Sequence, residues 1–276
     1  MLTIEQLLRN KLAVAALIYL FVFMILIIFA GKVAPFDPVE IHPRDSLLAP
    51  NETYIFGTDD SGRDIFSRIL HGGKISVRVG FISTTISLLI GVPLGLLSGF
   101  NGGKLQFLIL RIMDIMLAFP GILLALVVVS ILGRGVNQVM VAVGIGNIPT
   151  VVRVVNGAVI SAKECEYVTA AKCIGAKNSR IMTRHILPNV LAPIIVIATM
   201  NIASGLLSAS SLSFLGLGAQ PPSPEWGAMI SRGRMNLRMS PWMSTYPGLA
   251  IASIVISFNT IGDALRDALD PWIRAR

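Results

Sequence analysis

Cysteine, histidine and charged residues are all scarce in this sequence of 276 residues. It has two cysteines and three histidines, and Asp, Glu, Lys and Arg make up 14% of it. A soluble domain has roughly a quarter charged residues, so this composition argues against a soluble protein. Cys165 and Cys173 are eight residues apart on one predicted helix and cannot reach each other. We expect two free thiols in a reducing cytosol.

Sequence motifs for catalysis, nucleotide binding and metal binding are also missing. The Gly-Gly-Lys triplets at 72–74 and 102–104 lack the earlier glycine and the following hydroxyl of a phosphate-binding loop. The histidines, His42, His71 and His185, are scattered, and no His-Glu-x-x-His pair or Gly-x-Ser-x-Gly elbow occurs. We therefore expect a protein that is not an enzyme and that has no metal site and no cofactor of its own.

Long apolar runs dominate what is present. The sequence is 54% hydrophobic, with a mean hydropathy of +0.74. About 20 helical residues span the ~30 Å core of a bilayer, and runs of that length recur. They are continuous rather than alternating, which argues against a membrane β-barrel. We predict an all-α polytopic membrane protein with six transmembrane helices, near residues 12–30, 79–100, 109–132, 138–160, 190–212 and 246–261.

The basic residues indicate how the chain is oriented. Arg9 and Lys11 precede the first apolar run, which exceeds the 7–15 residues of a cleaved signal peptide. A dense basic group lies between Arg153 and Arg184, and such residues favour the cytoplasmic side. We expect a cytosolic central loop and cytoplasmic N- and C-termini. The net charge of +8 then reflects topology and lipid headgroups rather than nucleic acid.

Two spans carry further local signals. Gly91, Gly95 and Gly99 recur every four residues in the second span, a pattern that lets another helix approach closely, and Pro93 predicts a kink. Arg111 and Asp114 lie near the start of the third span. We expect them to pair at the membrane interface, with a buried proton site as the alternative.

The central loop predicts a short amphipathic helix. Tyr167, Ala170, Ala171 and Ile174 have the spacing of one helical face, and Gly175 follows where a left-handed cap would end the helix. A second short run, 179–187, leads to Pro188 and the next apolar block. The small side chains of this helix form a surface that a groove on another protein could accept.

Two polar stretches lie on the opposite side. Residues 56–68 read Phe-Gly-Thr-Asp-Asp-Ser-Gly-Arg-Asp-Ile-Phe-Ser-Arg, which predicts a turn and then a short interfacial helix containing Ile65, Phe66 and Ile69. Residues 211–228 contain glycines and prolines that exclude a continuous helix beyond Leu215.

Together these stretches resemble a known family. Ala170-Ala171-x-x-x-Gly175, followed by Leu187-Pro188, resembles the "EAA" loop with which permeases of ATP-driven (ABC) importers dock on their ATPase. Gly-Thr-Asp-x-x-Gly-Arg-Asp at 57–64 and the stretch 211–228 resemble the second permease of the dipeptide/oligopeptide/nickel branch. One departure is Thr169, where the family usually has Glu; Glu166 lies one turn earlier.

The resemblance implies a type I ABC importer fold and a domain organisation. Residues 1–31 would form the N-terminal tail and first helix, 32–73 an extracytoplasmic loop, 74–267 the permease core with a coupling loop at 161–188, and 268–276 a cytoplasmic tail. It also implies four kinds of partner: a second homologous permease, two ATPase subunits that bind ATP and magnesium, an extracytoplasmic solute-binding protein, and membrane lipid.

The resemblance further assigns residues. The ATPase-coupling residues would be Glu166, Tyr167, Ala170, Ala171, Gly175, His185, Leu187 and Pro188. Contact with the binding protein would fall on Gly57, Asp59, Asp60, Arg63, Gln220, Glu225 and Trp226.

The implied function is import of dipeptides or oligopeptides, including small peptides such as glutathione, across the inner membrane. Import of a nickel chelate is the alternative within the branch. An ion-coupled secondary transporter is the alternative from another class, but it would need ionisable groups at mid-membrane, where we find instead the polar residues Asn147, Asn156, Asn201 and Asn259. A passive channel would need a filter sequence, which we do not find.

Overall fold

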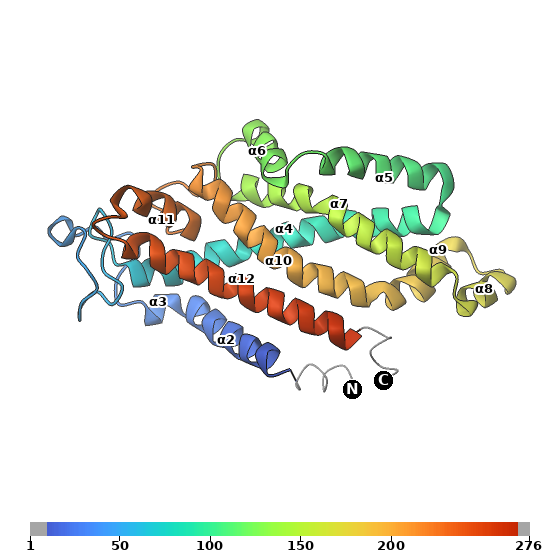
Figure 1. Cartoon of the computed structure of the whole chain (residues 1–276), viewed down its shortest axis with the longest axis horizontal. Coiled ribbons are helices and arrows are strands. Elements are labelled where there is room, and N and C mark those ends of the chain that lie inside the picture. Colours follow the sequence, from blue (N-terminus) through green and yellow to red (C-terminus); the bar gives the residue numbers. More distant parts are fainter. Residues whose placement is uncertain (1–9, 270–276) are drawn as a thin grey trace.

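The computed structural model describes residues 10–269, so Arg9 and most of the predicted 268–276 tail lie outside the described residues. The described chain is a bundle of long helices running between two ends of an elongated molecule (Figure 1). Its elements are α2 (Lys11–Ile28), α3 (Ala30–Val33), η1 (Pro43–Asp45), α4 (Ile65–Asn101), α5 (Gly103–Leu117), α6 (Gly121–Leu132), α7 (Val136–Lys163), α8 (Glu166–Cys173), α9 (Asn178–Arg180), the π-helical η2 (Ile181–Ile186), η3 (Leu187–Val190), α10 (Leu191–Phe214), α11 (Trp226–Gly233), η4 (Arg234–Asn236) and α12 (Trp242–Leu269).

The prediction of an all-α membrane protein is confirmed. Among the described residues, five helices are long and apolar enough to cross a membrane, and α5 with α6 makes a sixth if the pair counts as one span. The prediction of a continuous third span is wrong, because α5 and α6 meet at an angle of 91°. Pro120 causes the break: it has no N–H to donate and disfavours helical backbone at Phe119.

The second span also differs from its prediction. The expected interfacial helix and the second span form one helix, α4, of 37 residues, capped by Asp64, whose side chain accepts a hydrogen bond from the Ser67 N–H at 2.8 Å. The polar stretch between the two predicted helices stays helical because protein covers it. A β-carbon added to Gly72 would lie 1.9 Å from the carbonyl oxygen of Pro224, and Ser76 is buried.

Helices α4 and α7 pack closely through the glycine stripe. Each glycine faces a fully buried valine: β-carbons added to Gly91, Gly95 and Gly99 would lie 2.7, 2.6 and 2.7 Å from Cβ of Val151, Val155 and Val159, respectively. Any side chain on this stripe would therefore push the two helices apart.

Helices α5 and α7 are linked by an ion pair. The Nη2 atom of Arg153 donates to Oδ1 of Asp114 at 2.6 Å, and both side chains are about half exposed. The predicted partner of Asp114, Arg111, lies on the same helix. The carboxylate instead turns toward the neighbouring helix, so the predicted pairing is wrong.

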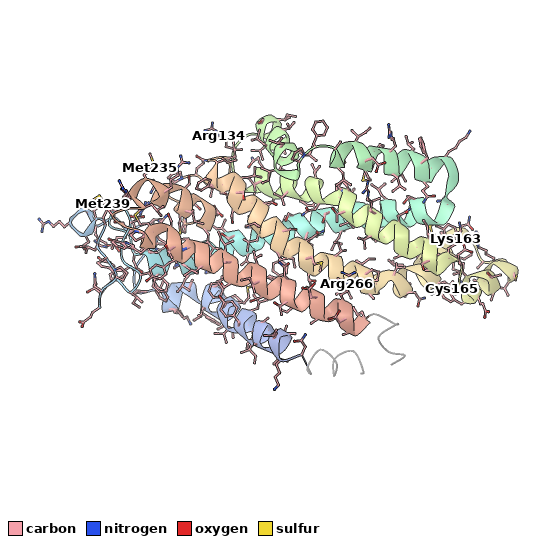
Figure 2. All side chains as sticks on the ribbon, in the orientation of Figure 1. Arg134, Lys163, Cys165, Met235, Met239 and Arg266 are labelled. Carbon is pink, nitrogen blue, oxygen red and sulfur yellow. The ribbon has the colours of Figure 1, made fainter. Side chains whose placement is uncertain are left out.

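The two ends of the bundle differ in character. One end carries α8, and the other carries α11 together with the segment between α3 and α4 (Figure 1). In Figure 2, Lys163 and Cys165 lie at the α8 end, whereas Arg134, Met235 and Met239 lie toward the α11 end. The two candidate contact surfaces are therefore separated by the full length of the membrane-spanning helices.

Candidate functional site

The helix α8 ends as its sequence predicts. Its last residue is Cys173, and Gly175 follows with a φ of +76°, a backbone conformation that glycine adopts at little cost. The N–H of Ala176 donates to the carbonyl oxygen of Ala171 at 3.1 Å, and that of Gly175 donates to Lys172 at 3.0 Å. These bonds satisfy carbonyls that a helix end otherwise leaves free.

A buried face fixes α8 to the bundle. Val168 and Ala171 are 0% and 4% exposed and belong to a core cluster with Ile181 and Ile186. The sequence predicted that Ala171 shares one face with Tyr167, Ala170 and Ile174. That prediction fails for Ala171, because its side chain faces the bundle and is not available to a partner.

An apolar stripe remains on the outside of α8. Tyr167, Ala170 and Ile174 are exposed, Ile174 to 84%. They follow the i, i+3, i+7 spacing of one helical face. Exposed apolar side chains in a row, held on a helix whose opposite side is anchored, form a surface suited to a complementary groove.

The other predicted coupling residues lie around this helix. Glu166 is exposed in the first turn of α8, where a carboxylate complements the helix dipole. His185 and Leu187 are half-buried and Pro188 is exposed. The His185 carbonyl oxygen accepts a hydrogen bond from Nδ2 of Asn189 at 2.6 Å. These three residues therefore form the junction between the loop and α10.

A buried cluster of charges organises the α11 end. Oδ2 of Asp59 lies 2.8 Å from Nε of Arg63 and 3.6 Å from Nε of Arg68, and its Oδ1 accepts the N–H groups of Ser61 and Arg63. Arg68 was absent from the sequence-based candidates. Its signal was available: it lies one turn inside the helix that the Asp-rich turn begins.

Burial also changes the expected contact surface for a binding protein. Gly57, Asp59, Arg63, Glu225 and Trp226 are all buried, so they do not form part of the accessible surface. Of the residues predicted for this contact, Asp60 and Gln220 are exposed.

Glu225 and Trp226 instead secure the segment before α11. The Glu225 carboxylate accepts hydrogen bonds from the N–H groups of Gly227 and Ala228 at 3.0 and 2.9 Å. Burial raises the pKa of Glu225, and these hydrogen bonds oppose that rise. Nε1 of Trp226 donates to the Ile69 carbonyl at 3.0 Å, which ties the segment to α4.

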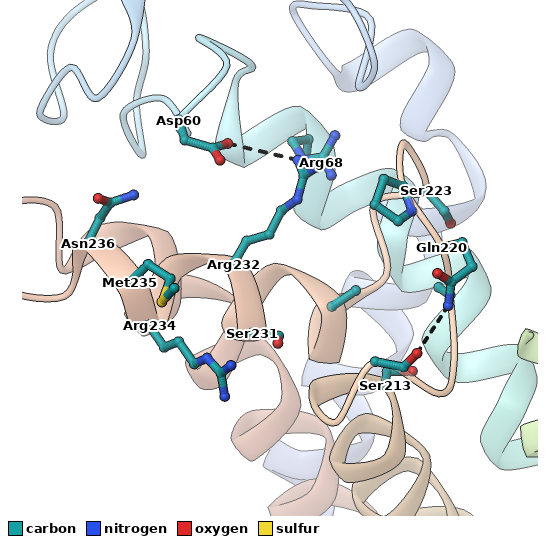
Figure 3. Close-up of a pocket in the computed structure, with 14 residues that line it drawn as sticks. Asp60, Arg68, Ser213, Gln220, Ser223, Ser231, Arg232, Arg234, Met235 and Asn236 are labelled. Carbon is teal, nitrogen blue, oxygen red and sulfur yellow. Dashed lines mark hydrogen bonds and ion pairs between the residues drawn. The ribbon is translucent and has the colours of Figure 1, made fainter. Parts of the chain in front are cut away.

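A pocket of about 320 Å³ opens beside this cluster, between the start of α4, the end of α10, the 215–225 segment and α11 (Figure 3). Three arginines line it, Arg68, Arg232 and Arg234, together with one carboxylate, that of Asp60. Figure 3 shows Arg232 reaching toward Asp60, with which it forms an ion pair at 3.8 Å.

Comparison with protein families identifies the chain. Residues 91–275 match the model of the binding-protein-dependent transport system inner membrane component, and residues 2–50 match the N-terminal transmembrane domain of oligopeptide transport permease C. The chain belongs to the binding-protein-dependent permease family. It is a second-permease type of ABC importer subunit, as its central loop and its 57–64 stretch predict.

Relatives of this permease are similar over nearly its whole length. The dipeptide transport system permease protein of Alkalihalophilus pseudofirmus is 47% identical over 271 residues, covering 98% of this chain and 89% of the relative. That of Haemophilus influenzae is 45% identical, covering 96% and 92%. The glutathione transport system permease protein of Pectobacterium atrosepticum is 42% identical, covering 98% and 90%.

A solved structure shares the fold of this permease. It is an inward-facing conformation of the MetNI methionine ABC transporter, with a TM-score of 0.62 at 19% identity, covering 75% of this chain and 98% of that one. The type I ABC importer fold is thereby confirmed. The permease is a multi-pass membrane protein that works in an ABC transporter complex with other subunits, and its relatives are named permeases rather than ATPases.

Proposed function

We propose that this chain is one of two permease subunits of an importer that moves small peptides into the cytoplasm. Relatives named for dipeptides, di- and tripeptides and glutathione are 47%, 42% and 42% identical to it over nearly the whole chain. Their names do not favour the nickel-chelate alternative. Membership of a binding-protein-dependent family favours an importer driven by a separate ATPase over an ion-coupled secondary transporter.

The exposed stripe on α8 supports this helix as the place where energy from the ATPase enters the permease. Tyr167, Ala170 and Ile174 would contact a groove on the ATPase subunit. That subunit, and not this chain, would bind ATP and magnesium. Val168 and Ala171, buried on the other side of α8, join it to the core cluster of η2 and η3. A displacement of α8 is therefore transmitted to α10, and a partner that binds one arrangement more tightly shifts the population toward it.

This assignment also orients the molecule. With α8 in the cytoplasm, the α11 end faces outward, where a solute-binding protein would dock and where Asp60 and Gln220 are accessible. The second permease would complete the pathway. The termini, which lie outside the described residues, would both be cytoplasmic under this orientation.

Replacement of Ala170 by Arg tests the coupling role. Ala170 is exposed, so the substitution does not disturb the core, but it places a long cationic side chain in the middle of the stripe. In proteoliposomes holding the complete complex, we expect ATP hydrolysis to continue while dipeptide uptake per ATP falls about tenfold, the effect of losing roughly 1.4 kcal/mol of coupling free energy.

The matched control is Met239→Arg, a substitution of the same charge at a residue that is 77% exposed at the opposite end of the molecule. It should leave the ratio of uptake to hydrolysis unchanged. Equal ratios for Ala170→Arg and the unaltered complex would refute the coupling role of α8.

A further inference from the structure

The pocket beside α11 carries more positive than negative charge. Its lining holds three guanidinium groups, Arg68, Arg232 and Arg234, against one carboxylate, that of Asp60. Arg63 and Arg68 are each 3% exposed. Both pair with Asp59, so the surplus positive charge lies on Arg232 and Arg234, where it favours an anion.

The hydrogen-bond donors around Asp60 are also incompletely used. Its Oδ1 atom lies 3.6 Å from Nη2 of Arg63 and 3.8 Å from Nη1 of Arg232, both beyond hydrogen-bonding distance. Within the described part of the chain, these two nitrogens are buried and have no hydrogen-bond partner. Unmade hydrogen bonds of buried charged donors are costly. Of the two residues, Arg232 lines the pocket, so an oxygen anion there is the complementary group for its Nη1.

Arg234 stands at the boundary between this pocket and an apolar groove. Its guanidinium carbon lies 5.3 Å from the ring centroid of Phe214, and among the described residues it has no carboxylate within ion-pair distance. Phe214 lines the groove, which has a volume of about 640 Å³ and lies between α10, α11 and α12. Ser213 and Ser231 line the pocket, and their neighbours Phe214 and Ile230 line the groove. A cationic pocket thus opens beside an apolar one.

We propose that this pocket binds the C-terminal carboxylate of a small peptide at the entrance to the pathway, with Arg232 and Arg234 as the binding residues. The inference rests on the proposed peptide import. Guanidinium groups bind carboxylates through paired N–H···O bonds, and the pocket volume lies within the roughly 300–1,000 Å³ of ligand pockets. Arg68, held by the carbonyl oxygens of Pro38 and Pro222 at 2.6 and 3.4 Å, supplies a fixed positive charge behind them.

The test uses the complete complex in proteoliposomes and two probes, Ala-Ala and its C-terminal amide, at concentrations that saturate the binding protein. Arg234→Gln and Arg232→Gln should each slow Ala-Ala uptake about tenfold, the effect of one charged hydrogen-bonded pair. Arg234→Lys, which keeps the charge, should recover part of the rate. Arg238→Gln removes an exposed arginine of the same end that does not line the pocket, and should have no effect.

The C-terminal amide of Ala-Ala tests whether the group bound in the pocket is the peptide's carboxylate. It lacks the charge, so the unaltered complex should move it more slowly than Ala-Ala, and Arg234→Gln should slow it no further. Equal rates for acid and amide in the unaltered complex would overturn the proposal, as would equal rates for Arg234→Gln and Arg238→Gln.

The affinity of the complex for the binding protein identifies the source of the carboxylate. If Arg234→Gln lowers that affinity and slows both probes alike, the pocket holds an acidic side chain of the binding protein and the proposal is wrong. If the unaltered complex moves neither probe, the proposed function itself fails, which is distinct from failure of the pocket alone.

Discussion

A β-carbon added to Gly95 of α4 would lie 2.6 Å from Cβ of Val155 on α7. The same relationship one turn before and one turn after makes a continuous close seam between α4 and α7. Small residues at four-residue spacing are how membrane helices approach closely in a solvent that offers no hydrophobic drive for association.

Replacement of Gly95 by Ala should destabilise the complex. Overpacking costs about 1–3 kcal/mol, which matches or exceeds the roughly 1 kcal/mol that Ala gains over Gly in a helix. We expect a lower thermal unfolding midpoint for the purified complex. Gly157→Ala on α7 is the control, because nothing lies within 4 Å of an added β-carbon there. Equal midpoints for the two variants would contradict the proposed seam.

Asp59→Asn should unfold the α11 end. Asp59 is the carboxylate that pairs with both Arg63 and Arg68, and removing one partner of a buried pair costs about 3–5 kcal/mol. The thermal midpoint should fall far more than for Glu52→Gln, which neutralises an exposed carboxylate of the same loop. A similar small change for both variants would show that the cluster does not hold this end together.

Glu225 predicts a pH dependence with a definite sign. Burial raises the pKa of the Glu225 carboxyl group, so the folded protein binds the carboxyl proton more tightly than the unfolded chain does. Stability should therefore fall as the pH rises from the ordinary carboxyl pKa to the raised one, and then stay level. Glu225→Gln removes this ionisation. The midpoint of the unaltered complex minus that of the variant should decrease from pH 4 to pH 8; a constant or increasing difference would contradict the assignment.

The regular parts of this fold follow from the sequence, because apolar run length and glycine spacing are local signals. The glycines of α4 and the cap at Gly175 are of this kind. The long polar start of α4 is not, because its helicity depends on contacts of Gly72 and Ser76 with a segment some 150 residues away. The break before α6 had a local signal in Pro120, which hydropathy alone conceals.

The candidate sites also differ in how much of each a local sequence signal predicts. The coupling loop could be located by motif, but which of its alanines faces outward depends on packing against Ile181 and Ile186. The arginine pocket could not be located, because Arg68 is distant in sequence from Arg232 and Arg234 and meets them only once α11 packs beside α4.

Thiol labelling checks the orientation of the bundle. Cys165 and Cys173 are both free and exposed at the α8 end. A maleimide that does not cross membranes should label them in inside-out vesicles and not in intact cells. A Met239→Cys variant lacking both native cysteines should show the reverse. Labelling of the native thiols in intact cells would invert the orientation proposed for this permease.

The central claim is that energy enters through α8, and cross-linking tests it most directly. In a background without native cysteines, Ile174→Cys should form a disulfide or short bismaleimide link to a cysteine in the ATPase groove, and the yield should change when ATP binds. Met239→Cys should form none. If the complex assembles and hydrolyses ATP while Ile174→Cys never reaches the ATPase, the account is contradicted.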